Sequence, residues 1–437
     1  MMSIEKEFFH GESESEKIFV EKRLQQKPFL FDGEIASENG ELVYVGDGME
    51  FCNDEFREGE KIFIPDKRVF SFASLGIMGL IEELAESPFQ EFHFKEMMKL
   101  NQAMNESDGL YAPPGYGNWA YYERDDALVQ YLPEDIHILA LVLRNSVLHI
   151  DPEMEMSWQE MREVFENTVP VVMGLSVGGT IAMAIEQLMR PKHMVLADMG
   201  VWSLPNTNRV PFLHYQNMLK NLKEVKETGD FFGRNKAIVL AEQMYGINPY
   251  RNKYVYSEGL GLKNFSDLLG NKIMPKATFV VDEADRLSDK TAMAEFCRKN
   301  RIRYIGVTDA WPFIILNVRA FDVDDSLPIS MGVDDDDLYE YLRIGNKSQE
   351  GFFDFAERYV GKHLSEDYPF GRVIKGSLDW FGMGIPQPIT AILYGAGLLT
   401  DRIALSLTGH YTSERIILNL LDLSILMDGE MVPPIKI

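Results

Sequence analysis

Glycines and one acid in the middle of the chain have the types and spacing of a turn that binds phosphate and ribose. Gly174, Ser176, Gly178 and Gly179 belong to the segment Gly-Leu-Ser-Val-Gly-Gly, and Asp198 follows further along the chain. Glycines let the backbone approach a phosphate closely, and a carboxylate at this distance would accept hydrogen bonds from ribose hydroxyls. Ser176 replaces the second glycine of the dinucleotide-binding pattern, so the turn by itself is a weak signal.

The elements that must position this turn have the expected order. An apolar run at 169–173 predicts a strand before the turn, a helical pattern follows to about Met189, and the apolar run 193–197 predicts a second strand that ends at Asp198. This order predicts the first βαβ unit of a Rossmann nucleotide-binding domain, in which the helix N-terminus offers free N–H groups to a phosphate. The alternative is a structural βαβ unit that binds no ligand.

The wider pattern predicts an α/β fold. Strand and helix signals alternate from about residue 143 to 325, which is typical of a Rossmann-like, mainly parallel sheet with helices on both faces. Residues 1–142 lack this alternation and predict an N-terminal α+β region, with a hairpin around Asn39 and Gly40. Residues 326–437 predict a C-terminal helical region. Its main helix, from Pro388 to about Leu407, has a small-residue face that suits either a partner helix or the core.

Composition excludes several classes of protein. A net charge of −25 over 437 residues argues against binding to nucleic acid or to an anionic membrane surface. With only two cysteines, Cys52 and Cys297, a Cys-based zinc ribbon is excluded, a disulfide framework is not expected and a cytoplasmic location is expected. The longest apolar stretch carries Asp401 and Arg402 and predicts a buried helix, not a membrane span.

Further motifs follow the turn in a fixed order. They are Asn206-Thr-Asn-Arg209, Asn235-Lys236-Ala237, Asn248-Pro249 and Asp282-Glu-Ala-Asp285, with Arg144-Asn145 upstream of the turn. In this order the chain resembles the ThiF/MoeB/HesA family, the bacterial relatives of ubiquitin-activating enzymes, over roughly residues 115 to 325. It looks closest to a branch with a Gly-Leu-Ser-Val-Gly turn.

The resemblance implies activation of a carboxylate by MgATP, which gives an acyl adenylate and releases pyrophosphate. It implies that Arg209 and Lys236 contact the phosphates, that Asp285 holds Mg²⁺ and that Asn206 orients the phosphate or ribose. Taken singly, these residues have plainer interpretations: a surface arginine, a solvated helix start and a helix cap. The resemblance also implies a homodimer in which Arg144 reaches the partner's triphosphate; a local salt bridge is the alternative for Arg144.

Departures from the family pattern leave other functions open. Gly200 stands at the position of a second acid, Pro205 at that of a serine, Val210 at that of a glutamine and Arg286 at that of an asparagine. One alternative is therefore a degenerate scaffold without catalysis, and another is an NAD(P)-dependent oxidoreductase. Cys297 lies in an apolar helical setting and is expected to be a packed thiol, which favours an enzyme without its own thioester. The substrate is expected to be a small acid, a peptide or the C-terminus of a ubiquitin-like protein.

Overall fold

In a computed structural model the chain forms two compact units. The first comprises Met1–Pro152 with Ala241–Asn252, and the second Glu153–Leu240 with Lys253–Ile437. The described residues are 14–31, 34–38, 41–45, 50–52, 55–57, 62–63, 69–71, 118–122, 124, 127–132, 134, 137, 158–208, 210–211, 218–220, 225–226, 229, 233–310, 313–330, 333–344, 389–409, 415–420, 424–427 and 430–432.

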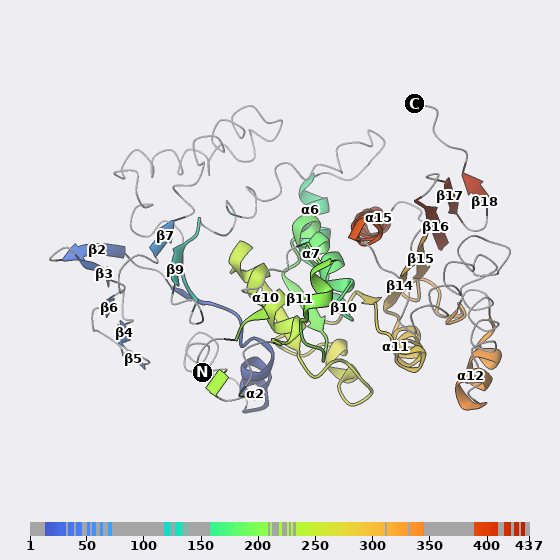
Figure 1. The fold of residues 1–437 in the computed structure, drawn as a ribbon, viewed down its shortest axis with the longest axis horizontal. Coiled ribbons are helices and arrows are strands. Elements are labelled where there is room, and N and C mark those ends of the chain that lie inside the picture. Colours follow the sequence, from blue (N-terminus) through green and yellow to red (C-terminus); the bar gives the residue numbers. More distant parts are fainter. Residues whose placement is uncertain are drawn as a thin grey trace. The chain divides into compact units, whose positions relative to one another are not determined.

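A nine-stranded sheet organises the second unit (Figure 1). Its strand order is β12-β11-β10-β13-β14-β15-β16-β17-β18. The bounds are β10 Pro170–Met173, β11 His193–Ala197, β12 Asn252–Tyr256, β13 Phe279–Asp282, β14 Arg303–Ala310, β15 Phe313–Arg319, β16 Arg415–Asn419, β17 Ser424–Met427 and β18 Glu430–Val432. β10 pairs in parallel with β11 and β13, and β13 with β14, whereas β14 to β18 pair antiparallel in succession. The sheet is therefore parallel around the glycine turn and antiparallel beyond β14.

Burial explains why the central strands are almost wholly apolar. Every residue of β10 and β13 is buried, as are the last four of β11 and β12. Parallel strands covered on both faces read as such continuous apolar runs. The predicted α/β, Rossmann-like fold is confirmed.

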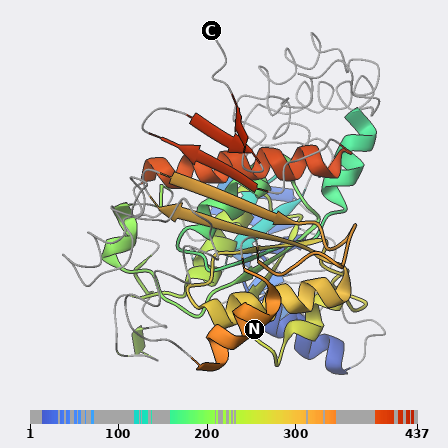
Figure 2. The same ribbon diagram turned by 90° about the vertical axis from the view of Figure 1, so that its right-hand side faces the viewer.

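Helices cover the two faces of this sheet. The helical elements of the second unit are α6 Trp158–Glu166, α7 Gly178–Met189, η3 Leu204–Asn208, η4 Phe265–Leu269, α11 Leu287–Asn300, α12 Asp335–Ile344 and α15 Ile389–Leu407, and α10 Lys236–Ile247 begins there. Figure 2 shows α15 on one side of the antiparallel strands and α11 and α12 on the other.

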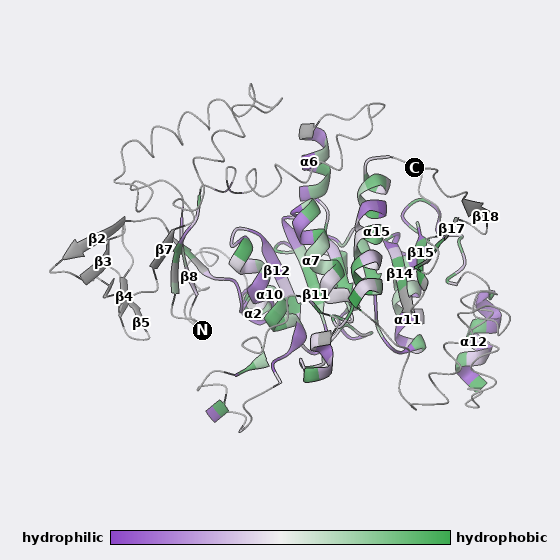
Figure 3. Cartoon of the chain, turned by 45° about the horizontal axis from the view of Figure 1, so that its top comes forward, coloured by the Kyte–Doolittle hydropathy of each residue, from purple (hydrophilic) through white to green (hydrophobic). Residues whose placement is uncertain are grey.

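The helix α15 is long and apolar enough to cross a membrane by length and composition alone. It packs instead against α7, β14 and β15 and buries Ile392, Leu399 and Ile403. Figure 3 shows the apolar residues that run along it. Burial of this face agrees with the predicted core helix.

The described part of the first unit is built mainly from short strands. One sheet has the order β1-β8-β9-β7, a second β2-β3-β6 and a third β4-β5. The bounds are α2 Glu14–Arg23, β1 Phe29–Phe31, β2 Glu34–Glu38, β3 Glu41–Val45, β4 Glu50–Cys52, β5 Glu55–Arg57, β6 Ile62–Phe63, β7 Val69–Ser71, β8 Trp119–Tyr122 and β9 Ala127–Gln130. The β2–β3 pair is antiparallel and closes at Glu38 and Glu41, which confirms the hairpin predicted around Asn39-Gly40.

The last turn of α10 belongs to this first unit and is closed by its aromatic side chains. The Tyr122 hydroxyl donates to the carbonyl of Tyr245 at 2.7 Å, and the Tyr131 hydroxyl to that of Gly246 at 3.1 Å. Helix C-termini leave such carbonyls without intrahelical partners. Apolar residues at helical spacing also predict helices at 75–85 and between Arg209 and Gly233, and these two segments lie largely outside the described residues.

Candidate functional site

The strand order places the glycine turn at a topological switch point of the sheet. β10 is the first strand of the unit and lies centrally, with β11 and β12 to one side and β13 and β14 to the other. The order therefore reverses between β10 and β13, and open α/β sheets bind ligands at the carboxyl ends of strands at such a switch point. Gly174 directly follows β10, and Glu283 directly follows β13.

Gly174 is required by the close approach of these two strand ends. Its φ is +80°, and a Cβ there would lie 2.3 Å from the backbone oxygen of Glu283. Gly178, at the start of α7, packs against β10, since a Cβ there would lie 3.1 Å from Val172 Cγ1. The N–H groups of Gly178 and Gly179 bond back to the carbonyls of Gly174 and Leu175 at 3.1 and 3.2 Å. The turn is thereby wound tightly into the helix.

The N-terminus of α7 has no side-chain cap. Its cap residue, Val177, makes no capping hydrogen bond. The first N–H groups of the helix already bond to carbonyls of the turn, so the helix dipole is the feature of this helix start that favours an anion.

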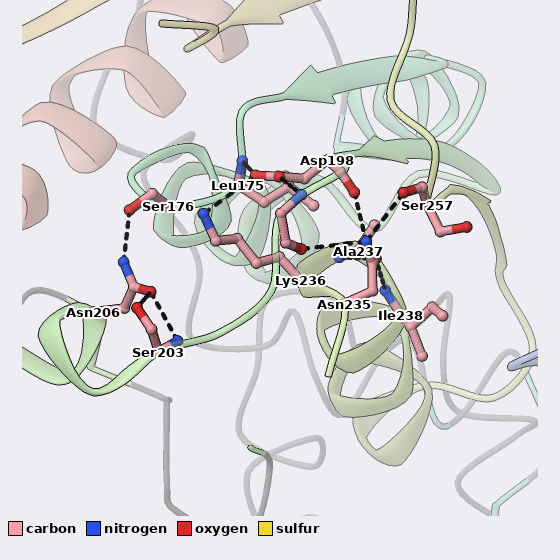
Figure 4. A network of polar contacts seen from close by, with 11 residues as sticks. Leu175, Ser176, Asp198, Ser203, Asn206, Asn235, Lys236, Ala237, Ile238 and Ser257 are labelled. Atoms are coloured by element: carbon pink, nitrogen blue, oxygen red, sulfur yellow. Dashed lines mark hydrogen bonds and ion pairs between the residues drawn. The ribbon is translucent and has the colours of Figure 1, made fainter. Parts of the chain in front are cut away.

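Asp198 joins the turn to the segment that follows β11. Its Oδ2 accepts a hydrogen bond from the Leu175 N–H at 2.7 Å, and its Oδ1 from the Gly200 N–H at 2.6 Å (Figure 4). The Lys236 Nζ lies 3.7 Å from Oδ2. Asp198 thus holds the glycine turn and faces a cation, as a carboxylate that anchors a binding site does.

Lys236 is the first residue of α10, and its side chain is only 14% exposed. A cation at a helix N-terminus opposes the helix dipole, at a cost of roughly 0.3–1 kcal/mol. Asp198 offsets this cost, and Nζ also lies 5.7 Å from the centre of the Trp202 ring, within the range of a cation–π contact. A partly buried cation is thus held beside Asp198, although the dipole of α10 disfavours it there.

Asn206 connects η3 with the glycine turn. Its Nδ2 donates to Ser176 Oγ at 3.3 Å, while its Oδ1 accepts from the N–H and hydroxyl of Ser203 at 3.1 and 2.9 Å. The serine in place of the second glycine therefore provides the acceptor for this connection. Asn206 is buried, so it is well fixed at the rim of the turn.

Asn235 directly precedes Lys236 in the motif Asn235-Lys236, and the sequence assigned it no role of its own. Its Nδ2 donates to the carbonyls of Asp198 at 2.8 Å and Ser257 at 3.1 Å, and its Oδ1 accepts from the N–H groups of Ala237 and Ile238 at 2.9 and 3.2 Å. Figure 4 shows this side chain between the two strand ends and the helix start. An asparagine directly before a predicted helix is a recognised cap signal, and it could have indicated this capping role.

The two acids at the end of β13 have different environments. Asp282 is buried and accepts hydrogen bonds from the Tyr304 hydroxyl at 3.0 Å and the Ala284 N–H at 2.8 Å. Asp285 is exposed, and no hydrogen bond or ion pair joins its carboxylate to the described residues. Within those residues there is also no cluster of three or more His, Cys, Asp or Glu that could hold a metal. A Mg²⁺ ion here would take Asp285 with water and phosphate as its other ligands, which is how this ion is often bound.

The remaining motif residues differ in their surroundings. Arg209 and Arg144 lie outside the described residues. Val210 is buried with Trp202, Met218 and Val239 in an apolar cluster. Pro205 is part of η3, and Arg286 is the exposed cap residue of α11.

Cys297 is a packed thiol, as predicted. It is fully buried on α11, and burial together with the nearby charge of Asp282 raises the pKa of its thiol well above the ordinary value. A protonated, inaccessible thiol is not a nucleophile. The side-chain surroundings of Cys52 lie outside the description.

Comparison with known proteins finds distant structural similarity. No family model and no curated protein matches the chain. The crystal structure of PaaA is similar at 15% identity and a TM-score of 0.45, over 68% of this chain and 82% of that chain. E. coli MccB is similar at 13% identity and a TM-score of 0.41, over 93% of this chain and 95% of that chain. The microcin C7 biosynthetic enzyme MccB in complex with N-formylated MccA shows 12% identity and a TM-score of 0.41, over 93% and 98%.

Identities and TM-scores this low assign no activity to the chain. The fold and the site by themselves define a Rossmann-like α/β protein with charged residues at its switch point. Asp198, Lys236, Asn206 and the glycine turn are joined there by hydrogen bonds and an ion pair within the second unit.

Proposed function

We propose that this protein is an adenylyltransferase that uses MgATP to activate a carboxylate as an acyl adenylate. The observation that carries the proposal is the position of Lys236. Its ammonium group is held 3.7 Å from Asp198 beside the glycine turn, although the helix dipole disfavours a cation there. A cation at this position is unfavourable for the helix but would favour binding of an anionic ligand.

Different residues of the site would bind the phosphates, the ribose and the metal ion of the nucleotide. The glycine turn and the helix dipole at the start of α7 suit phosphate oxygens. Asp198 already accepts two N–H groups, but a carboxylate has about four acceptor positions, which leaves capacity for a ribose hydroxyl. Asp285 offers an exposed carboxylate, and a Mg²⁺ ion bound there would neutralise phosphate charge.

The reaction requires positive charge around the phosphates. An oxygen of the substrate carboxylate attacks the α-phosphorus, and the bond from that phosphorus to the bridging oxygen breaks as pyrophosphate leaves. Lys236 would lower the repulsion between the two anions and stabilise the charge that develops at the α-phosphate. Arg209 would donate two parallel hydrogen bonds to the phosphates, as its resemblance-based role implies.

The acyl group and its acceptor stay open within this proposal. Candidate substrates are a small acid, a peptide and the C-terminus of a ubiquitin-like protein. Cys297 is buried, so this thiol takes no acyl group in the folded chain.

Calorimetry separates this function from its alternatives. We expect MgATP to bind, binding to weaken when Mg²⁺ is chelated, and Lys236→Met to lower the affinity for ATP by about tenfold or more, because a charged hydrogen bond is lost. Lys276→Met is a matched control, since Lys276 is exposed and bonds to the Asn300 carbonyl. Binding of NAD without binding of MgATP would overturn the proposal in favour of an oxidoreductase. MgATP binding without ATP–pyrophosphate exchange for any of the three substrate types would favour a scaffold.

A further inference from the structure

Asn235 stands where three backbone segments of the site meet. It lies opposite Val201 in an isolated antiparallel bridge, and the Lys236 N–H donates to the Gly200 carbonyl at 3.0 Å. The chain that leaves β11 is thereby paired with the chain that enters α10. The side chain of Asn235 carries an acceptor oxygen and a donor nitrogen, and each makes its own hydrogen bonds at this junction.

The side-chain oxygen closes the N-terminus of α10. Oδ1 accepts from the N–H groups of Ala237 at 2.9 Å and Ile238 at 3.2 Å. These two donors have no intrahelical partner, so the oxygen acts as an N-cap. The start of this helix is therefore satisfied by the side chain that precedes it.

The side-chain nitrogen ties the same helix to two strand ends. Nδ2 donates to the carbonyl oxygens of Asp198 at 2.8 Å, Ser257 at 3.1 Å and Gly200 at 3.3 Å. Asp198 and Ser257 directly follow β11 and β12. A cap needs only the oxygen, so the nitrogen contacts point to a second role.

That second role concerns the residue next in the chain. Lys236 begins α10, and its Nζ must reach Asp198 from a backbone position that these contacts fix. A lysine side chain is long and flexible, so fixing its origin narrows the positions available to the ammonium group.

We propose that Asn235 is a positioning residue that acts through Lys236, tying the start of α10 to the ends of β11 and β12 so that the ammonium group lies beside Asp198. Its consequence for nucleotide affinity rests on the proposed function. Its consequence for the position of Lys236 does not.

Two substitutions separate the tie from the cap. Asn235→Ser keeps a good capping oxygen, and so does Asn235→Asp, but neither can make the amide donations to Asp198 and Ser257. Asn271→Ser is the matched control, because Asn271 Oδ1 likewise accepts from two N–H groups, those of Ile273 and Met274, in an exposed turn. The two Asn235 variants serve as duplicates, so that one remains if the other does not fold.

The first measurement needs no nucleotide. Lysine acylation by a water-soluble active ester is followed by mass spectrometry in the full chain, and the rate is determined for Lys236. We expect both Asn235 variants to label several-fold faster than wild type, because the amine leaves its partly buried place, while Asn271→Ser labels at the wild-type rate. An unchanged rate in folded Asn235 variants, or an equal increase in the control, overturns the proposal.

The second measurement uses MgATP and adenosine in calorimetry. We expect Asn235→Ser to weaken MgATP binding by about tenfold, with adenosine binding unchanged, and Asn235→Ser/Lys236→Met to be no weaker than Lys236→Met alone. Additive losses in the double variant would show that Asn235 acts independently of Lys236 and would overturn the proposal. Faster labelling of Lys236 in a protein that binds no MgATP would instead refute the proposed function and leave the positioning role supported.

Discussion

Gly200 is the residue at which this chain departs most informatively from the family it resembles. Its N–H donates to Asp198 Oδ1, and a Cβ at this position would lie 2.9 Å from that oxygen and 3.3 Å from Lys236 Nζ. The place of a second acid is therefore taken by the Asp198–Lys236 pair. The departure does not require loss of function, because Asp198 and Lys236 occupy the place where a second acidic side chain would begin.

Replacing Gly200 tests this account. In Gly200→Ala, the atoms that must move are side-chain ends, so we expect a small change in stability but about tenfold weaker MgATP binding as the Asp198 carboxylate is displaced. Calorimetry and thermal unfolding measure the two effects. Gly306→Ala is the control, since nothing lies within 4 Å of its added carbon. Equal ATP affinity in Gly200→Ala and wild type would contradict the account.

Asp285 and Asp282 lie in different environments. Asp285 is exposed and has no partner in the described chain, whereas Asp282 is buried and hydrogen-bonded. We expect Asp285→Asn to reduce Mg²⁺-dependent ATP–pyrophosphate exchange by about 10²-fold while thermal stability stays within about 0.5 kcal/mol of wild type. Asp282→Asn should show the reverse emphasis and lose mainly stability. Unchanged exchange in Asp285→Asn would remove this carboxylate from the site.

Cys297 links stability to pH. Its pKa is raised in the folded chain, so the folded state holds the thiol proton more tightly than the unfolded state does. This contribution is full below the unfolded pKa of about 8.5 and is lost as the pH rises through that value toward the folded pKa. We expect stability to fall above this pH and the fall to be smaller in Cys297→Ala. Native Cys297 should also resist alkylation at pH 9; rapid labelling of the folded chain would show that the thiol is accessible.

At the scale of elements, one buried ion pair joins the helix of the glycine turn to the sheet. Glu186 on α7 lies 2.9 Å from Lys253 on β12, and both side chains are fully buried. Such a pair is costly to desolvate, and removing one partner leaves an uncompensated charge in the core. The pair therefore joins α7 to β12 through a contact that neither partner can lose cheaply.

Substitution of this pair has a characteristic signature. Lys253→Met should lower the free energy of unfolding by about 3–5 kcal/mol, and Glu186→Leu/Lys253→Met should recover most of the loss, because no unpaired charge remains. Chemical denaturation measures both. Lys192→Met is the control, since its Nζ lies 3.9 Å from Glu166 on a half-exposed side chain and should change stability by less than about 1 kcal/mol. A double variant as unstable as Lys253→Met would show that packing, not charge, dominates.

At the scale of the whole molecule, α10 contributes to both compact units. Its first residues, including Lys236, belong to the second unit. Its last residues belong to the first unit, which contains Tyr122 and Tyr131. The domain boundaries proposed at residues 142 and 325 stay predictions, as do the homodimer and the cytoplasmic location.

The homodimer proposal is tested by mixing inactive variants. Arg144→Ala and Lys236→Met should each lose about 10²-fold or more in adenylation rate. If Arg144 completes the partner's site, a mixed dimer contains one site with both wild-type residues and regains part of the activity. If Arg144 acts within its own chain or forms a local salt bridge, mixing restores nothing. Absence of recovery, with subunit exchange confirmed by mass spectrometry, would exclude the role across the dimer.

Local features of the chain were predictable from the sequence. The strand before Gly174, the helix after it and the strand that ends before Asp198 are all found near their predicted bounds. Each depends on residue types within a few positions: apolar runs form buried strands, and a glycine permits the positive φ that ends one of them. Hydrophobic periodicity also predicted the α/β class.

Tertiary structure alone decided how these features meet. The reversal of strand order between β10 and β13 brings the Glu283 backbone against Gly174, and the sheet continues through antiparallel strands as far as β18. Asn235 reaches the carbonyls of Asp198 and Ser257 only because β11 and β12 end beside the start of α10. No local pattern encodes such contacts, since they depend on which buried faces pack together. The sequence by itself determined the candidate ligands, and packing between distant segments decided which of them share a site.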